Sequence, residues 1–125
     1  MWFRKDITLK TYHQALIIDD EPELCTLLKA ILTDFIPDVK YAHSIESAEK
    51  FLMQLKPDVI FLDNNLPDGQ GLNCIAEIKR FSPEARLIII TASDISKESV
   101  IQRGGDDLLE KPLNNANILK ALTAP

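Results

Sequence analysis

The sequence predicts an α/β fold, a doubly wound five-stranded parallel sheet with helices on both faces. Three uninterrupted apolar runs, 15–18, 59–62 and 87–90, do not alternate with polar residues, which is typical of strands buried on both faces. Helical patterns alternate with the strands, and such alternation favours right-handed crossovers between parallel strands. With 125 residues and 46% hydrophobic content, the chain can bury the core of a single domain.

The first two strand and helix units are expected within residues 15–55. The run 15–18 ends at Asp19, and Pro22 opens a helix there, because proline is favoured at the first helical position. The expected apolar face of this helix consists of Leu24, Leu27, Leu28, Ile31, Leu32 and Phe35. Residues 39–42 alternate, which suits a half-exposed edge strand, and Ser44 is a good N-cap for the next helix.

The second half of the chain begins with the strand 59–62, which stops at Asp63. Turn residues follow it, since proline and glycine in the stretch 66–71 favour a loop held open above this acid. The elements expected next are a helix over 72–81, a strand over 87–90 that ends at Thr91, a short helix over 96–103 stopped by Gly104 and Gly105, and a strand over 108–110. Asn114 or Asn115 then caps a final helix.

Polar side chains stand at the carboxyl ends of the central strands, where open α/β sheets bind ligands. They are Asp19 and Asp20, Asp63, Thr91 and, after the neighbouring strand, Lys111. Three carboxylates in one place repel one another unless a cation lies among them, and hard oxygen ligands select Mg²⁺ or Ca²⁺. With Mg²⁺ and the lysine the formal charges sum to zero. Such a site can accept a phosphoryl group on Asp63, giving an acyl phosphate.

The order and spacing of four motifs carry a resemblance to a known family. Asp19-Asp20, the stretch 61–69 around Asp63, Thr91-Ala92 and Lys111-Pro112 together resemble the receiver domain of two-component response regulators. The resemblance implies a flavodoxin-like (βα)5 fold with strand order 2-1-3-4-5. It covers nearly the whole chain, so residues 14–125 are assigned to the receiver domain and residues 1–13 to an N-terminal arm.

The resemblance also implies a reaction and a metal. Asp63 is expected to take a phosphoryl group from a histidine kinase or a histidine phosphotransfer protein, and to pass the signal to a downstream output domain or protein. By the same resemblance, Asp20, Asp63 and the main-chain carbonyl of Asn65 bind Mg²⁺ directly, while Asp19 acts mostly through water. A phosphorylation-dependent dimer is a further option. The chain is expected to be a signalling phosphoacceptor and not an enzyme.

Two further residues contact the phosphoryl oxygens in the family, and here they are Thr91 and Lys111. The family's Lys-Pro bond is usually cis, so the Lys111–Pro112 bond is expected to be cis as well. A tyrosine or phenylalanine commonly lies three residues before the lysine and couples the site to the face formed by helix 4, strand 5 and helix 5. Leu108 occupies this position. The segment 91–111 is short for the family, which predicts a shortened fourth helix and a coupling that runs through Thr91 and its loop.

Three other functions fit parts of the pattern. A haloacid-dehalogenase-type phosphohydrolase also uses a strand-end aspartate with Mg²⁺, but it needs a second acid two residues later, where this chain has Asn65. A flavodoxin-like binder of FMN needs hydroxyls and amides around phosphate, whereas the acids at 19–21 would repel it. A receiver-like docking module that works without phosphate is disfavoured because every expected site residue is present.

Composition limits the partners and the location. The net charge of −5 and pI near 5.0 argue against direct binding of nucleic acid by this domain, because that needs a basic face. No apolar stretch approaches the roughly 20 residues that cross a bilayer, and residues 1–6 lack the apolar run of a signal peptide, so a cytoplasmic location away from the membrane is expected. Cys25 and Cys74 are isolated in sequence, which favours buried thiols over a disulfide or zinc site.

Overall fold

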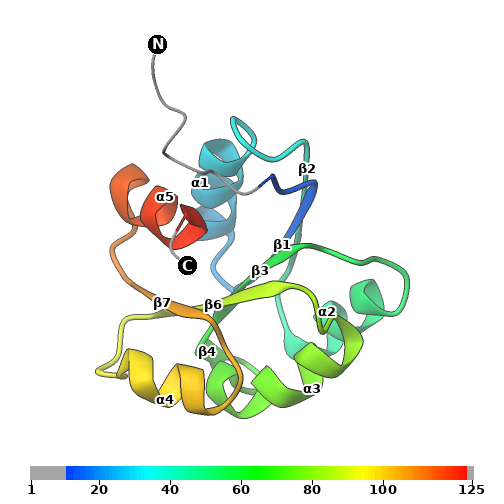
Figure 1. Cartoon of the computed structure of the whole chain (residues 1–125), viewed down its shortest axis with the longest axis vertical. Helices are drawn as coiled ribbons and strands as arrows, with labels where there is room; N and C mark the ends of the chain where they lie inside the picture. The colour runs from blue at the N-terminus through cyan, green and yellow to red at the C-terminus, as the bar shows by residue number, and fades with distance from the viewer. Residues whose placement is uncertain (1–10, 124–125) are drawn as a thin grey trace.

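A five-stranded parallel sheet lies between two helical layers in the computed structural model, which describes residues 11–123 (Figure 1). The strands of the sheet are β1 (Gln14–Ile18), β2 (Asp38–Ala42), β3 (Val59–Asp63), β6 (Arg86–Thr91) and β7 (Asp107–Glu110). The helices are α1 (Pro22–Leu32), α2 (Ile45–Leu52), α3 (Ile75–Phe81), α4 (Lys97–Gln102) and α5 (Asn115–Thr123). The strand order is β2-β1-β3-β6-β7. Since β6 and β7 are the fourth and fifth strands of this sheet along the chain, the order confirms the predicted 2-1-3-4-5.

Two apolar layers hold the sheet, one on each face. Helices α1 and α5 cover one face, and α2, α3 and α4 cover the other (Figure 1). Every residue of β3 is buried, with Phe61 packing in the layer of α1 and α5 and Ile60 and Leu62 packing in the opposite layer. The uninterrupted apolar runs are therefore strands buried on both faces, as the sequence predicts, and β3 is the middle strand of the sheet.

The predicted helix starts are found with their capping residues. Pro22 is the first residue of α1. The side-chain oxygens of Ser44, Ser96 and Asn114 each accept a hydrogen bond from the amide three residues further on, at 3.1, 3.1 and 2.8 Å, and so cap α2, α4 and α5. Asn114 is therefore the N-cap of the last helix, and Asn115 is its first residue.

Helix α4 is short, as predicted, and a glycine turn ends it. Gly104 has a φ of +102°, which a residue with a side chain rarely adopts, and the Gly105 N–H donates to the Val100 carbonyl at 2.9 Å. These contacts leave α4 with six residues.

The loop after Asp63 is more ordered than the sequence suggests. Strands β4 (Asn65–Leu66) and β5 (Gly69–Gln70) form a small antiparallel hairpin, and a 3₁₀ turn, η1 (Gly71–Cys74), precedes α3. The helix expected from residue 72 thus begins at residue 75. Gly71 packs directly on the end of β3, since a Cβ atom there would lie 2.5 Å from the Asp63 carbonyl oxygen. This close approach positions the hairpin beside Asp63.

The apolar face expected for α1 is too wide. Leu28 and Leu32 are fully buried, but Leu27 is 50% exposed and Phe35 is 44% exposed. Phe35 follows the C-cap Thr33, so the helical spacing that assigned it to the face no longer applies there. Leu27 lies to the side of the stripe that contacts the sheet, which is formed by Cys25, Leu28 and Leu32. Of the two cysteines, Cys25 is buried and Cys74 is partly buried.

The assignment of residues 1–13 to an arm falls mainly on residues 1–10, which lie outside the described residues, and it stays a prediction. Tyr12 itself is buried in the core, and its hydroxyl donates to the Leu122 carbonyl of α5 at 2.8 Å. None of the helices within residues 11–123 has both the length and the apolar character needed to span a bilayer.

Candidate functional site

The predicted site residues meet at the carboxyl edge of the sheet. Ile18 of β1 pairs with Leu62 of β3, and Asp63 pairs with Ile90 of β6, so the ends of the three central strands lie side by side. Thr91 pairs with Glu110, which places Lys111 next to the same edge. The three apolar strands therefore end side by side at this edge. The polar residues that follow them, Asp19, Asp63 and Thr91, lie close together as a result.

Three acids converge there. Asp19, Asp20 and Asp63 each offer a carboxylate oxygen, and these oxygens all lie within 4.8 Å of one another. Asp19 and Asp63 are buried, whereas Asp20 is exposed. Oxygens of this type and spacing suit a hard divalent cation, so the acidic group can hold a metal ion.

Asp19 is only partly compensated by the protein. Its Oδ1 accepts a hydrogen bond from the Glu21 N–H at 2.8 Å. Its Oδ2 makes no hydrogen bond within the described part of the chain, and the Lys111 Nζ lies 3.5 Å away. Burial raises the pKa of Asp19 from 3.8 to about 6; the neighbouring Asp63 adds to the rise, while the Glu21 amide and Lys111 oppose it. This carboxylate would be stabilised by a further cation.

Asp63 has a similar environment. Its Oδ1 accepts a long hydrogen bond from the Asn65 N–H at 3.3 Å and lies 3.6 Å from the Lys111 Nζ. Burial raises the pKa of Asp63, while the Asn65 amide and the Lys111 charge lower it. The carboxylate is therefore buried but weakly bonded, which leaves its oxygens available to a reactant.

Lys111 reaches into the cluster from the end of β7. Its Nζ lies 2.5 Å from Glu21 Oε1, as well as near Asp19 and Asp63. Burial lowers the pKa of Lys111, but the hydrogen bond to Glu21 and the charges of the acids outweigh it and the pKa is raised. The ammonium is thus charged. The Lys111–Pro112 bond is cis, which confirms that expectation. The sequence placed Glu21 in an acidic run but did not identify it as the partner of this lysine.

Thr91 lies buried at the end of β6. Its Oγ1 accepts from the Ser93 N–H at 2.9 Å, and its carbonyl accepts from the Lys111 N–H at 2.8 Å. Among residues 11–123, the hydroxyl proton has one acceptor, the Ser93 carbonyl, at 3.5 Å. A bond this long is weak, so the hydroxyl can turn its proton toward an anion at the site.

Asn64 is a buried residue of the site that sequence reasoning missed. Its N–H donates to the Ile90 carbonyl at 2.9 Å, and its Oδ1 accepts from the Leu72 N–H at 3.0 Å. These bonds hold both ends of the loop that follows Asp63. An asparagine in a turn sequence gives no signal of this role. Asn65 itself is exposed, and its carbonyl as a metal ligand stays a prediction.

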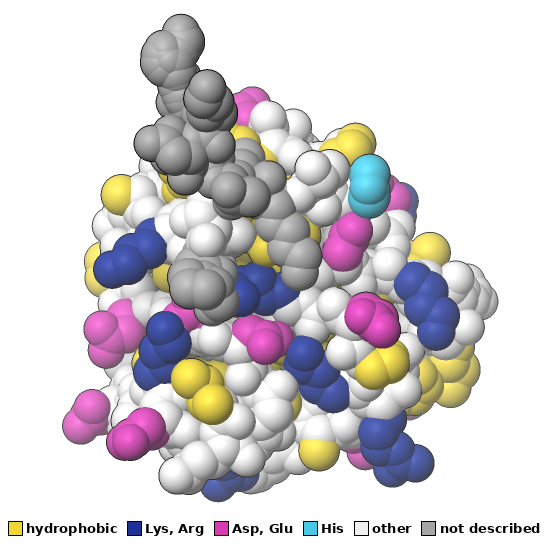
Figure 2. All heavy atoms as spheres, viewed as in Figure 1, with side chains coloured by type: hydrophobic (Ala, Val, Ile, Leu, Met, Phe, Trp, Pro, Cys, Tyr) yellow, Lys and Arg dark blue, Asp and Glu magenta, His cyan; other side chains and the backbone are white. Residues whose placement is uncertain are grey.

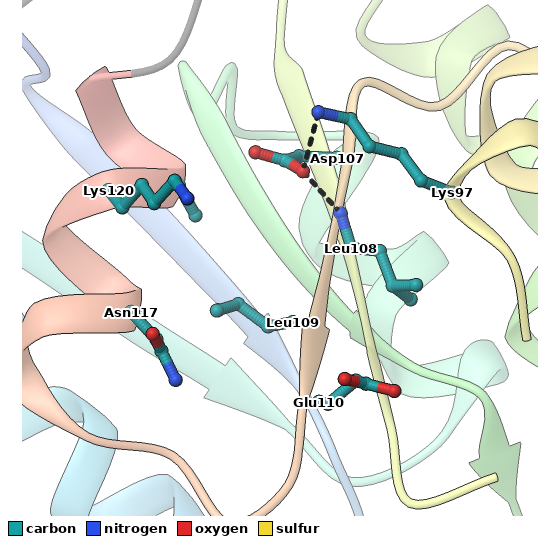
Figure 3. Close-up of a pocket in the computed structure, with 8 residues that line it drawn as sticks. Lys97, Asp107, Leu108, Leu109, Glu110, Asn117 and Lys120 are labelled. Carbon is teal, nitrogen blue, oxygen red and sulfur yellow. Dashed lines mark hydrogen bonds and ion pairs between the residues drawn. The ribbon is translucent and has the colours of Figure 1, made fainter. Parts of the chain in front are cut away.

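Leu108 lies in β7, away from the cluster of acids. Leu108 and Leu109 point to opposite sides of the strand, Leu108 toward the layer of α4 and Leu109 toward α5 (Figure 3). Next to them, Asp107 is bonded to the Arg86 guanidinium at 3.3 Å and to the Lys97 Nζ at 3.4 Å. Asp107 is therefore a buried member of an ion-pair network.

Comparison with known proteins agrees with this geometry. The family model for the response regulator receiver domain matches residues 15–123. The chain is 34% identical over 105 residues to the response regulator protein PilR of Pseudomonas aeruginosa, covering 82% of this chain and 23% of PilR. It is 31% identical over 111 residues to the chemotaxis protein CheY of Listeria monocytogenes, covering 86% of this chain and 92% of CheY. The chain thus spans less than a quarter of PilR but nearly all of CheY.

A solved structure is similar over most of the fold. It is a response regulator protein from Burkholderia pseudomallei with a phosphorylated aspartic acid, a calcium ion and citrate. The TM-score is 0.80 at 29% identity, and the match covers 90% of this chain and 67% of that chain.

Proposed function

The chain belongs to the response regulator receiver domain family, and we propose that it accepts a phosphoryl group on Asp63. As a receiver domain of two-component response regulators it is a signalling domain. The observation that carries the proposal is the pairing of a buried, weakly bonded carboxylate with a charged ammonium, since the Lys111 Nζ lies 3.6 Å from Asp63 Oδ1. Such an arrangement suits a nucleophile that must receive a highly charged group.

The proposed step is a transfer from a phosphorylated histidine. An oxygen of Asp63 forms a bond to phosphorus as the bond between phosphorus and the histidine nitrogen breaks, and that nitrogen keeps the electron pair. The products are an acyl phosphate and a free imidazole. Lys111 and Thr91 are placed to hold the phosphoryl oxygens, the first by charge and the second by its hydroxyl proton. The donor is a histidine kinase or a histidine phosphotransfer protein.

Mg²⁺ is the metal proposed for the acidic group. The residues fit it, because three carboxylate oxygens lie within 4.8 Å and one oxygen of Asp19 makes no hydrogen bond within residues 11–123. Asp20, Asp63 and the main-chain carbonyl of Asn65 would hold the ion directly, and Asp19 mostly through water. When bound, Mg²⁺ supplies positive charge next to the phosphoryl oxygens.

The proposed response to phosphorylation runs through the segment 92–105. Leu108 cannot reproduce the movement of an aromatic ring, whereas Thr91 is directly followed by a loop and by the short helix α4. Short elements with few buried residues are readily reordered, and Val100 is the one buried residue of α4. With Mg²⁺ and beryllium fluoride we expect larger amide shifts in 92–105 than at Leu108 and Leu109. Larger shifts at Leu108 and in α5 would contradict this route.

The proposed partners are proteins. Acidic and basic side chains are interspersed on the face shown in Figure 2, and the net charge is −5, so direct contact with nucleic acid is not part of the proposal. Because the chain spans less than a quarter of PilR, an output domain or a separate output protein is proposed as the target. We also propose that phosphorylation promotes dimer formation and that the protein works in the cytoplasm. Its role is that of a signalling phosphoacceptor and not of an enzyme.

Incubation with acetyl phosphate and Mg²⁺, followed by intact mass spectrometry, tests the phosphoacceptor. The parent is expected to gain one phosphoryl group, and Asp63→Asn is expected to gain none. Asp34→Asn removes an exposed acid at the far end of α1 and should react like the parent. Phosphorylation of Asp63→Asn at the parental rate would show that another residue is the acceptor.

A further inference from the structure

Asp68 binds the start of a distant helix. It lies in the turn between β4 and β5, and its two carboxylate oxygens accept hydrogen bonds from the Ile45 N–H at 3.0 Å and the Glu46 N–H at 3.1 Å. The first amides of a helix lack partners within the helix, and Ser44 caps the amide of Ser47. Hydrogen bonds from these two amides lower the pKa of Asp68, so it is ionised at neutral pH.

The same turn before α2 also holds the segment that carries Asp19. The His43 Nδ1 lies 2.9 Å from the Asp19 carbonyl oxygen, and it must be the donor because a carbonyl only accepts. The Asp19 N–H in turn donates to the Ala42 carbonyl at 3.0 Å. The segment 42–46 therefore contacts the segment that carries Asp19, through His43, and the hairpin that follows Asp63, through Asp68.

The hairpin that Asp68 holds is small. Strands β4 and β5 have two residues each, and an isolated hairpin of this size is not stable in water. Asn65, whose N–H bonds to Asp63, pairs with Gln70 in this hairpin. Asn64 and Gly71 hold the base of the hairpin, and Asp68 holds the opposite end.

We propose that Asp68 is a positioning residue of the metal site. By holding the hairpin on α2, it fixes Asp63 and the carbonyl of Asn65 relative to Asp19 and Asp20. This role rests on the proposed function, since it takes the acidic group as a Mg²⁺ site. Groups that orient metal ligands change the affinity about 10- to 100-fold when they are removed, and we expect the lower end for Asp68→Ala.

Calorimetric titration with Mg²⁺ compares three variants with the parent. Asp68→Ala should raise the Kd about tenfold. Ser44→Ala removes the N-cap of α2 but leaves the hydrogen bonds between Asp68 and the helix. It should leave the Kd for Mg²⁺ within about twofold of the parent value, even if it destabilises α2 as much as Asp68→Ala does. Glu46→Gln removes a neighbouring exposed charge and keeps its amide, so it should also bind like the parent. Asp68→Asn keeps one acceptor oxygen and should fall between the parent and Asp68→Ala.

Amide spectra give a second measurement that a purely structural cap would not change. Because coupling between two sites is reciprocal, Mg²⁺ should shift the amides of Ile45 and Glu46 in the parent and in Ser44→Ala, but not in Asp68→Ala. The positioning role is overturned if Asp68→Ala binds Mg²⁺ like the parent, or no more weakly than Ser44→Ala or Glu46→Gln. A parent that binds no Mg²⁺ would instead overturn the proposed metal site, and the positioning role with it.

Discussion

Acids lie at both ends of the sheet, but those at the amino edge have more complete hydrogen bonds and ion pairs than those at the carboxyl edge. At the amino edge, the Asp58 carboxylate accepts hydrogen bonds from the backbone N–H groups of His13 and Gln14 at 2.7–3.1 Å. Asp106 Oδ2 accepts from the Leu87 N–H at 2.8 Å and from the Lys79 Nζ at 2.9 Å. These carboxylates are matched by donors of the protein itself.

Asp107 is the most buried acid of the amino edge, and it is also matched. One oxygen faces the Arg86 guanidinium and the other faces Lys97, as Figure 3 shows for the lysine. At the carboxyl edge, by contrast, Asp19 has an oxygen without a hydrogen bond in the described region, and Asp63 has one long bond. Burial raises the pKa of both.

The difference separates acids that stabilise the fold from acids kept for a reaction. Matched acids at β-strand starts fix the register of loops and neighbouring strands, and removing one leaves its partner unpaired. Buried acids with too few hydrogen bonds or ion pairs lower the stability of the fold until a cation binds. Functional sites often contain such acids. The two ends should therefore respond to substitution with opposite signs.

The largest expected effect is the loss of the buried pair at the amino edge. Asp107→Ala should destabilise the protein by about 3 kcal/mol, because the Arg86 guanidinium would stay buried without its carboxylate. Urea unfolding measures the change, and Asp34→Ala, at an exposed acid, serves as the control. A loss no greater than that of the control would remove the distinction between the two ends.

A gain of stability is expected at the carboxyl edge. At pH 7 without Mg²⁺, Asp19→Asn should stabilise the protein by about 2 kcal/mol, because it removes a charge whose burial raises the pKa to about 6. The asparagine oxygen can still accept from the Glu21 N–H. The same urea titration measures this gain, and a loss of stability would mean that the carboxylate contributes to the fold.

The pH dependence sharpens this point. Between pH 3.8 and about 6 the folded protein keeps a proton on Asp19 that the unfolded chain has lost. The contribution of Asp19 to the free energy of unfolding should therefore fall as the pH rises through this window, by up to about 1.4 kcal/mol per pH unit, and be level above it. The difference between parent and Asp19→Asn isolates the effect. A difference that is constant from pH 4 to 7 would contradict it.

The smallest expected effect is at the exposed end of the Asp107 network. Lys97 is 56% exposed, and Arg86 remains as a partner, so Lys97→Ala should change stability by less than about 0.5 kcal/mol. Thermal unfolding of this variant beside Arg86→Met shows which cation matters. A Lys97→Ala loss as large as that of Arg86→Met would place the main stabilising pair on α4.

The carboxyl edge could be predicted from the sequence because its signals are local. Each apolar run ends directly at the residue that matters, as at Asp63 and Thr91, and the parallel topology brings the run ends together without any knowledge of side-chain contacts. The short α4 was also predictable, since Gly104 and Gly105 mark its end in the sequence.

The missed features depend on partners that are far apart in the chain. Asp68 bonds to Ile45 and Glu46, and Asp107 bonds to Arg86, so no short pattern reveals them. Phe35 was assigned to the face of α1 because its spacing is helical, although the helix has already ended there. Composition and spacing predict which helices and strands form. They do not predict which side chains bond to a different helix or strand.

Thermal unfolding at increasing Mg²⁺ concentrations tests the central contrast most directly. The parent should be stabilised by about 2.7 kcal/mol at a concentration 100 times the Kd. Asp107→Ala should show the same gain from a lower starting point, and Asp20→Ala should show none, since it lacks an exposed ligand of the acidic group. A parent whose midpoint does not change with Mg²⁺, or an Asp107→Ala variant that loses the gain, would contradict the account.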